Sequence, residues 1–258
     1  MSGELSDSLR QWTEARVALG RSGGSVPHGE LLDFRLSHAR ARDAVHQAFD
    51  PVGLAAELEE RGLSSILAPS QAPDRATYLQ RPDLGRCLTP DAAGQLSALR
   101  RADGFDLVII LSDGLSAEAA HRHGPPFVAV LITLLVGWEI APLVIAPFAR
   151  VALQDEIGDL LGARTALILL GERPGLGSPD SLGAYLVHTP RPGNTDAERN
   201  CVSNIRTKGL PPMAAAQRIA WLLKEARRLG FSGVDLKDLS ADVPGMAKIH
   251  EKQASETQ

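Results

Sequence analysis

The sequence predicts an α/β fold, and the clearest reason is a change of pattern near residue 104. Residues 106–111 are wholly apolar, which is typical of a strand buried on both faces of a parallel sheet. Further strand-like runs follow near 141–146, 165–170 and 184–189, and segments with helical spacing separate them. Strands that alternate with helices indicate βαβ units, so we expect a Rossmann-like parallel sheet with helices on both faces.

Before this α/β region the pattern is mainly helical. Apolar residues between 31 and 49 recur at helical spacing, with charged residues on the other side. Thr89 and Pro90 supply an N-cap and an N1 proline for a helix that runs to about residue 102. We therefore expect three parts: a helical N-terminal extension (1–103), a Rossmann-like domain (104–240) and a polar C-terminal tail (241–258).

Capping residues mark the helix boundaries of the α/β region. Ser116 is suited to cap a helix after the first strand of this region. Apolar spacing predicts a buried helix over 127–137 and another over 151–161 that ends at Gly162. The last long helix opens at a pair of prolines and stops at Gly230.

The longest apolar stretch, residues 127–146, has about the length of a bilayer-spanning helix. It contains Glu139, whose charge would be costly in lipid, and Pro142 follows soon after. We therefore interpret the stretch as a buried helix followed by a buried strand, and we expect no membrane partner.

Composition argues against several kinds of partner and location. The net charge is -4, and neither a basic block nor interleaved basic and aromatic residues occur, which argues against nucleic acid. The two cysteines, Cys87 and Cys201, lie far apart and lack the spacing of zinc or redox motifs. The first residues lack the basic and apolar regions of a secretory signal. We therefore expect a reducing, cytoplasmic compartment.

Familiar catalytic and phosphate-binding motifs are missing. The chain has no G-x-x-x-x-G-K-[ST] loop, no G-x-G-x-x-G after the first α/β strand and no G-x-S-x-G turn. His121 and His123 are two residues apart and would point to different faces of a helix, which does not suit a metal pair. We expect both to be solvated, as we do His38 and His46. Cys201 has no adjacent base that would make it a nucleophile.

Three loops at strand ends are expected to converge on one edge of the sheet, where α/β proteins bind ligands. They are 112–116, the segment around 150–151, and Gly171–Gly177, which carries Glu172 and Arg173 beside three glycines and a proline. Backbone N–H groups, a helix N-terminus and few acids suit a polar or phosphorylated cofactor better than acid–base catalysis. The alternative is that these glycines only form tight turns.

Several longer segments carry a resemblance to a known family. They are Ser37–Arg42, Tyr78–Arg86, Ser112–Ala117, Val151–Gly158, Gly171–Gly177, Cys201–Ile205 and the pair Pro211-Pro212. In order and spacing they resemble the small (light) subunit of ethanolamine ammonia-lyase, an adenosylcobalamin-dependent enzyme. The resemblance extends over most of the chain and is poor before residue 30.

The resemblance implies a larger assembly and a radical reaction. A large subunit with a (β/α)8 barrel would bind ethanolamine and carry the chemistry, and the small subunit would close over the cobalamin from the other side. Homolysis of the cobalt–carbon bond would give a 5'-deoxyadenosyl radical, and amino-group migration would lead to acetaldehyde and ammonia. Further copies of the heterodimer would complete the assembly, and this chain would be inactive alone.

Within this family pattern, the cobalamin contacts of the small subunit fall on Val151, Glu172 and Cys201. Glu172 is an acceptor for hydrogen bonds from the corrin amide side chains, and Val151 and Cys201 offer close, uncharged packing. The chain lacks the D-x-H-x-x-G pattern, with Ala119 where Asp is needed, so base-on cobalamin is implied. The loop 192–198 is one residue shorter than is usual in the family.

Two other functions stay open from the residues alone. One is a scaffold subunit whose strand-end loops contact only partner protein. The other is a free-standing nucleotide-binding protein with a Rossmann-like fold, which the missing phosphate-loop motifs disfavour. A bacterial microcompartment is the alternative to a free cytoplasmic location, because a weakly amphipathic first helix resembles an encapsulation peptide.

Overall fold

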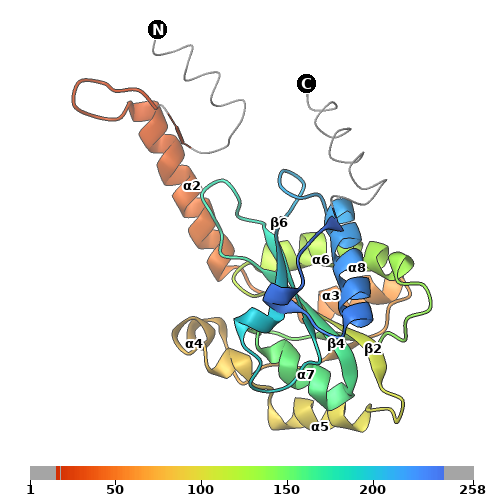
Figure 1. Cartoon of the computed structure of the whole chain (residues 1–258). Helices are drawn as coiled ribbons and strands as arrows, with labels where there is room; N and C mark the ends of the chain where they lie inside the picture. The colour runs from red at the N-terminus through yellow and green to blue at the C-terminus, as the bar shows by residue number, and fades with distance from the viewer. Residues whose placement is uncertain (1–15, 18, 241–258) are drawn as a thin grey trace.

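The computed structural model describes residues 16, 17 and 19–240, and these residues form a mixed six-stranded sheet between two layers of helices (Figure 1). The strand order across the sheet is β1-β3-β2-β4-β5-β6. The strands are β1 (Ser65–Leu67), β2 (Phe105–Ser112), β3 (Leu143–Ile145), β4 (Ala163–Gly171), β5 (Leu182–His188) and β6 (Arg199–Ile205).

Helices connect and cover these strands. In Figure 1, α2 extends away from the rest of the fold, whereas the other long helices lie against the sheet. The α-helices are α2 (His28–His46), α3 (Pro51–Glu60), α4 (Arg75–Gln80), α5 (Pro90–Ala98), α6 (Ala117–Leu134), α7 (Leu153–Leu161) and α8 (Pro212–Leu229). Short 3-10 turns are η1 (Leu84–Arg86), η2 (Asp196–Glu198) and η3 (Gly233–Asp235).

The α/β class is confirmed, but the expectation of a wholly parallel sheet is wrong. Strands β1, β3, β2 and β4 are parallel, whereas β5 pairs antiparallel with both β4 and β6. The reason is the length of the link between β4 and β5, residues 172–181. A parallel crossover needs about a dozen residues or more, usually with a helix, whereas an antiparallel pair needs only a hairpin.

The core consists of two apolar clusters, one on each face of the sheet. Alternate residues of β2 point into different clusters, as Leu107 and Ile109 do on one face and Val108 and Ile110 on the other. Helices α3, α6 and α8 pack in the first cluster, and α5 and α7 pack in the second. This double burial explains the continuous apolar run of β2. Residues before 104 thus contribute directly to the core of the α/β region.

Strong periodic signals predicted their elements well. Ser116 caps α6, Thr89 caps α5, and Gly162 and Gly230 end their helices in the left-handed region. The helix predicted over 127–137 is the second half of the longer α6, which accommodates two prolines in its interior.

Four helices and strands were not predicted: α3, β1, α4 and β6. Strand β1 has only three residues, and β6 is half exposed and mixes polar with apolar side chains, so neither resembles a buried strand. Within the described ranges, no helix is long and apolar enough to cross a membrane. The proposed encapsulation helix falls largely before residue 16 and the polar tail after residue 240, outside those ranges.

Candidate functional site

The three strand-end loops meet at one edge of the sheet, as predicted. The backbone N–H of Phe148, in the loop after β3, donates to Asp113 Oδ1 over 2.8 Å. Ala149 N donates to Ser112 Oγ over 3.1 Å, and Leu115 N donates to the carbonyl of Gly171 over 2.8 Å. Backbone and side-chain hydrogen bonds therefore fasten the ends of β2, β3 and β4 to one another.

The crevice between β2 and β4 is closed by the chain itself. A Cβ on Gly114 would lie 2.4 Å from the Gly171 carbonyl oxygen, and one on Gly171 would lie 2.1 Å from the carbonyl oxygen of Ser116. These glycines therefore permit contact between two backbones. Ser116 also caps α6 by accepting from Ala119 N, and its hydroxyl donates to the carbonyl of Pro179 over 2.9 Å. The helix N-terminus that would hold a phosphate in a nucleotide-binding protein is already occupied.

A buried ion pair supports this edge from beneath. Asp113 is 1% exposed, and its Oδ2 lies 2.9 Å from Nη1 of Arg75. Burial raises the pKa of Asp113, while the hydrogen bond from Phe148 N and the Arg75 charge act in the opposite direction. The same Arg75 side chain donates to the carbonyls of Val45 and Gly114. Arg75 therefore ties the end of α2 to the strand-end loops.

The segment Gly171–Gly177 is the first half of a hairpin that extends β4 and β5. Glu172 N donates to the carbonyl of Ser181 over 2.8 Å, and Gly175 and Ser178 exchange backbone hydrogen bonds of 3.1 and 3.3 Å. The segment was predicted as a glycine-rich loop after a buried strand at this edge of the sheet, and the structure shows that the loop is a hairpin. Because it is a hairpin, Glu172 lies at the base of an antiparallel pair.

The Glu172 carboxylate crosses β5 and reaches β6. Its Oε2 accepts hydrogen bonds from the Ser181 hydroxyl and, over 3.1 Å, from the backbone N–H of Asn204. Its Oε1 accepts no hydrogen bond from the described part of the chain. One oxygen is therefore held by the protein while the other remains available as an acceptor.

A β-bulge directs Asn204 toward that carboxylate. Leu182 pairs with Ile205 and Ala184 with Val202, so Gly183 faces two residues of β6. Asn204 has a positive φ of 60°, a conformation that asparagine tolerates better than most residues. Bulges of this kind often redirect groups at functional sites.

Gly183 leaves the space that the carboxylate occupies. A Cβ on Gly183 would lie 2.9 Å from Glu172 Oε1 and 3.0 Å from Cε2 of Tyr185. Tyr185 pairs with Cys201 across the β5–β6 ladder, and Cys201 Sγ lies 3.2 Å from Ser203 Oγ. All of these groups lie on the face of the sheet that carries α7. We call this patch the platform, and it consists of Glu172, Gly183, Tyr185, Cys201 and Ser203.

The platform is open because α7 stops short of it. Helix α7 packs on β2 and β4, whereas α8 packs on β4, β5 and β6 from the opposite face. Cys201 and Ser203 are therefore exposed, and Glu172 and Tyr185 are half-buried. Although Cys201 is exposed as a residue, neighbouring protein atoms partly desolvate its thiol and raise the pKa of that thiol. Burial raises the pKa of Tyr185, with Cys201 and Glu172 adding to the effect. Both groups are therefore neutral near pH 7.

Val151 lies at the entrance to α7, two residues before the helix begins, on the face of the sheet that also carries Tyr185. It packs against the same apolar cluster as Tyr185. The preceding residue, Arg150, stacks on the ring of Tyr78, with its guanidinium carbon 4.1 Å from the ring centroid, and donates to the carbonyl of Tyr78 over 3.0 Å. Its backbone N–H donates to the carbonyl of Gly85 over 2.7 Å. The segment 78–86 thus fixes where Val151 enters α7.

The structure places Glu172 and Cys201 around Tyr185 and puts Val151 on the same face of the sheet, and it adds other residues to the patch. Gly183, Tyr185 and Asn204 were missed because their role depends on antiparallel pairing and on a bulge. Alternation within β5 was the one signal that could have placed Tyr185 on a face.

The histidines divide into two groups. His38 and His46 are exposed, as predicted. The prediction of a solvated side chain is wrong for His123, which is 4% exposed and lies inside the long helix α6, with Nε2 3.1 Å from Asp180 Oδ2. His121 is partly buried, accepts from Asp50 N over 3.2 Å and has a pKa lowered by burial. Among residues 16, 17 and 19–240, no group of histidine, cysteine or acidic residues could hold a metal ion.

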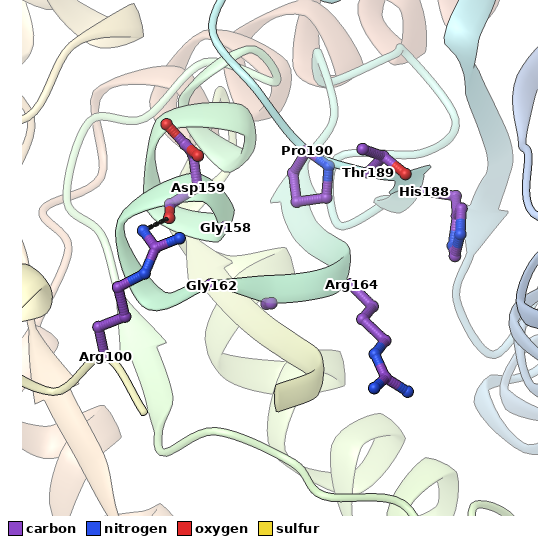
Figure 2. Close-up of a pocket in the computed structure, with 9 residues that line it drawn as sticks. Arg100, Gly158, Asp159, Gly162, Arg164, His188, Thr189 and Pro190 are labelled. Carbon is purple, nitrogen blue, oxygen red and sulfur yellow. Dashed lines mark hydrogen bonds between the residues drawn. The ribbon is translucent and has the colours of Figure 1, made fainter. Parts of the chain in front are cut away.

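An open hollow of about 290 Å³ lies at the opposite edge of the sheet (Figure 2). It is bordered by Arg100, whose guanidinium donates to the carbonyl of Asp159 over 2.8 Å, and by Arg164 and His188. In Figure 2 the side chain of Arg164 extends away from that of Arg100, so the two cations do not converge on one point. This hollow is separate from the platform.

The described residues form an α/β protein whose platform offers the Glu172 carboxylate as a hydrogen-bond acceptor beside the neutral side chains of Tyr185 and Cys201. A family model described as "Ethanolamine ammonia-lyase light chain (EutC)" matches residues 4–237. The chain belongs to this family, which confirms the membership expected from its motifs. It therefore has the role of the small subunit of an ammonia-lyase.

Similar proteins carry the same description. A protein of Pseudomonas fluorescens strain Pf-5 is 53% identical over 234 residues, covering 89% of this chain and 85% of its own length. One from Xanthomonas campestris pv. campestris strain ATCC 33913 is 50% identical over 251 residues, covering 96% and 92%. One from Pseudomonas putida strain KT2440 is 52% identical over 235 residues, covering 90% and 86%. Each is named "Ethanolamine ammonia-lyase small subunit".

Proposed function

We propose that this chain closes the adenosylcobalamin site of ethanolamine ammonia-lyase against a large barrel subunit. The platform, together with Val151, is the cobalamin-facing surface in this proposal. The observation that carries it is the arrangement of Glu172, Tyr185 and Cys201 on one open face of the sheet, the face on which Val151 also packs. The catalytic residues and the ethanolamine site belong to the large subunit, and further copies of the heterodimer complete the assembly.

The Glu172 carboxylate has the chemistry that a corrin ring needs. Corrin side chains carry amide groups, which are hydrogen-bond donors. Oε1 of Glu172 is available to accept from them, and its position is set by the two bonds that Oε2 accepts from Ser181 and Asn204. A charged acceptor that is already oriented loses little entropy on binding and makes a stronger hydrogen bond than a neutral one.

Cys201, Tyr185 and Val151 supply uncharged contact area. Because the pKa of Cys201 and that of Tyr185 are both raised, neither brings a charge against the cofactor at neutral pH. Gly183 has no side chain, and the Glu172 carboxylate fills the space where a Cβ would lie, beside the ring of Tyr185. An open sheet face with one oriented acceptor suits a broad, amide-rimmed macrocycle better than a small compact substrate.

In this proposal the chain itself performs no bond-breaking step. Bound adenosylcobalamin supplies the radical chemistry that removes hydrogen from ethanolamine. This chain holds the cofactor in place: Glu172 orients the amide groups at the rim of the corrin, and Val151 and Cys201 exclude water from the face that they cover. Water exclusion matters because it protects reactive intermediates from side reactions.

The first test is reconstitution with a purified large subunit. The full chain alone should release no ammonia from ethanolamine, and activity should require both the large subunit and adenosylcobalamin. Glu172→Ala should weaken cobalamin affinity in the complex by about tenfold, as expected for a charge-assisted hydrogen bond, while subunit association stays unchanged. Arg173→Ala, at the exposed neighbouring position, is the matched control and should leave the affinity unchanged.

Ammonia release by the chain alone would contradict the proposal. If Glu172→Ala leaves the cobalamin affinity unchanged, Glu172 does not contact the cofactor and serves only to hold the hairpin to β6. A double variant, Glu172→Ala with Cys201→Ala, separates the proposal from a pure scaffold role, because a scaffold would leave the cobalamin difference spectrum of the complex unaltered.

Location is a further part of the proposal. The protein acts in the cytoplasm, and a bacterial microcompartment is the alternative site. Deleting residues 1–15 and following the location of the fluorescently tagged complex would separate the two, because an encapsulation peptide would be lost with them.

A further inference from the structure

The second half of the β4–β5 hairpin tip is fastened to the first turns of α6 at consecutive residues. The Ser116 hydroxyl donates to the carbonyl of Pro179 over 2.9 Å. Asp180 Oδ2 lies 3.1 Å from Arg122 Nη1 and 3.1 Å from His123 Nε2. Helix α6 lies on the face of the sheet opposite the platform, so these contacts hold the tip from behind.

The His123–Asp180 contact is shielded from water, which the other ion pairs of α6 are not. The side chain of His123 is 5% exposed and that of Asp180 is 17% exposed. Arg122, in contrast, is 60% exposed and is shared with Glu118 at 3.4 Å. A carboxylate can only accept, so Nε2 of His123 is the donor. A shielded hydrogen bond to a charged group contributes more than an exposed ion pair.

The residue after Asp180 connects this contact to the platform. Ser181 is buried, its hydroxyl donates to Glu172 Oε2, and its carbonyl accepts from Glu172 N over 2.8 Å. A continuous chain of contacts therefore runs from His123 through Asp180 and Ser181 to the Glu172 carboxylate. The sequence pattern around His123 predicts no role for this residue, and the proposed reaction does not use it.

We propose that His123 and Asp180 are positioning residues that hold the hairpin tip so that Glu172 meets the cobalamin in a fixed orientation. This inference rests on the proposed function of the platform. A displacement of about 1 Å in a group that positions a contact is enough to lose much of the free energy that the contact contributes. Removing the Asp180 carboxylate removes the contacts of the tip with Arg122 and His123, so that Ser181, the next residue, holds Glu172 Oε2 less firmly.

The test uses the assembled complex and cobalamin titrations in two backgrounds. Asp180→Ala should weaken cobalamin affinity by about tenfold in the native background and should have no effect in a Glu172→Ala background, because it acts through Glu172. Asp180→Asn keeps an acceptor for His123 and should stay within about twofold of the native affinity. Glu118→Ala removes the other partner of Arg122 without touching Asp180 and is the matched control.

Hydrogen exchange of the cofactor-free complex gives a readout that does not involve cobalamin. The amides of Gly175 and Ser178, which bond each other across the tip, should exchange faster in Asp180→Ala than in Glu118→Ala. Exchange unchanged by Asp180→Ala would overturn the inference, as would an equal loss of affinity in both backgrounds. If Glu172→Ala and the Cys201 variant leave affinity unaltered, the proposed function fails instead, and the two failures are distinguishable.

Discussion

Replacing Gly183 with alanine is a direct test of how the platform is built. The added Cβ would lie 2.9 Å from Oε1 and 3.1 Å from Cγ of Glu172, and 3.0 Å from Cε2 of Tyr185. Favourable contacts of carbon atoms begin near about 3.5 Å, so each neighbour must move by several tenths of an ångström. Glu172 is the flexible neighbour and will move first. Its movement breaks one of the hydrogen bonds from Ser181 or Asn204.

The expected cost of Gly183→Ala is larger for binding than for folding. Overpacking of this size destabilises by about 1–3 kcal/mol, and the lower end applies here because a side-chain tip can give way. Cobalamin affinity should fall by about tenfold, close to the effect of Glu172→Ala, since both remove the oriented acceptor. In a Glu172→Ala background the same substitution should cost little, because only the Tyr185 contact remains.

Two assays and one control decide this prediction. Urea denaturation gives the free energy of unfolding, and titration of the complex gives the cobalamin affinity. Gly94→Ala in α5 is the control, because a Cβ there meets nothing within 4 Å and alanine stabilises a helix by about 0.5–1 kcal/mol over glycine. If Gly183→Ala leaves both the affinity and the unfolding free energy unchanged, the described packing of Glu172 over β5 is incorrect.

Two further predictions concern the supports of Val151 and of β6. Burial raises the pKa of Tyr78 to about 12. Between about pH 10 and pH 12 the tyrosine therefore keeps its proton in the folded state but has lost it in the unfolded state. The free energy of unfolding must fall by about 2–3 kcal/mol across this pH range. Tyr78→Phe should remove this alkaline loss in urea denaturation at pH 9 and 11, at a cost of about 1 kcal/mol at pH 7 for the hydrogen bond to Ala149; an identical pH dependence would contradict it. Arg199→Ala should destabilise the protein by about 3–5 kcal/mol, because it leaves the carboxylate of Asp155 buried without its partner. The exposed Arg191→Ala is the control for that denaturation measurement, and an equal effect of the two variants would contradict the argument.

Strong local signals made much of the fold predictable. Three predictions of this kind are confirmed: the apolar run is strand β2, the proline begins α5, and the glycine ends α7. The strand near 184–189 was predicted in the right place but with the wrong direction. Its direction depends on the length of the β4–β5 link and on its partner β6, whose half-exposed residues carry little periodic signal.

The site residues also divide into those that a local sequence pattern indicates and those that depend on contacts between distant segments. Gly171–Gly177 was found from its position after a buried strand, and that position is correct. The groups that orient Glu172 were beyond the reach of sequence patterns, because they come from a bulge and from a contact with α6. His123 is the clearest case: its spacing from His121 gave no indication of its burial against Asp180.

In a Rossmann-like sheet the ligand usually lies at the carboxyl ends of the parallel strands, whereas here the parallel and antiparallel halves of the sheet differ in what they leave open. The parallel half ends in a crevice that Gly114 and Gly171 close by backbone contact, so the usual ligand position is filled by the chain. The antiparallel pair β5–β6 then extends the sheet beyond α7 and exposes one face. Because a surface of this kind is open on one side, it can bind a large flat cofactor only if a second protein covers the opposite side. For this reason our proposal pairs the open face of this ammonia-lyase small subunit with a large subunit, and Glu172, which β6 holds at that face, is the group on which we expect the cofactor contact to depend.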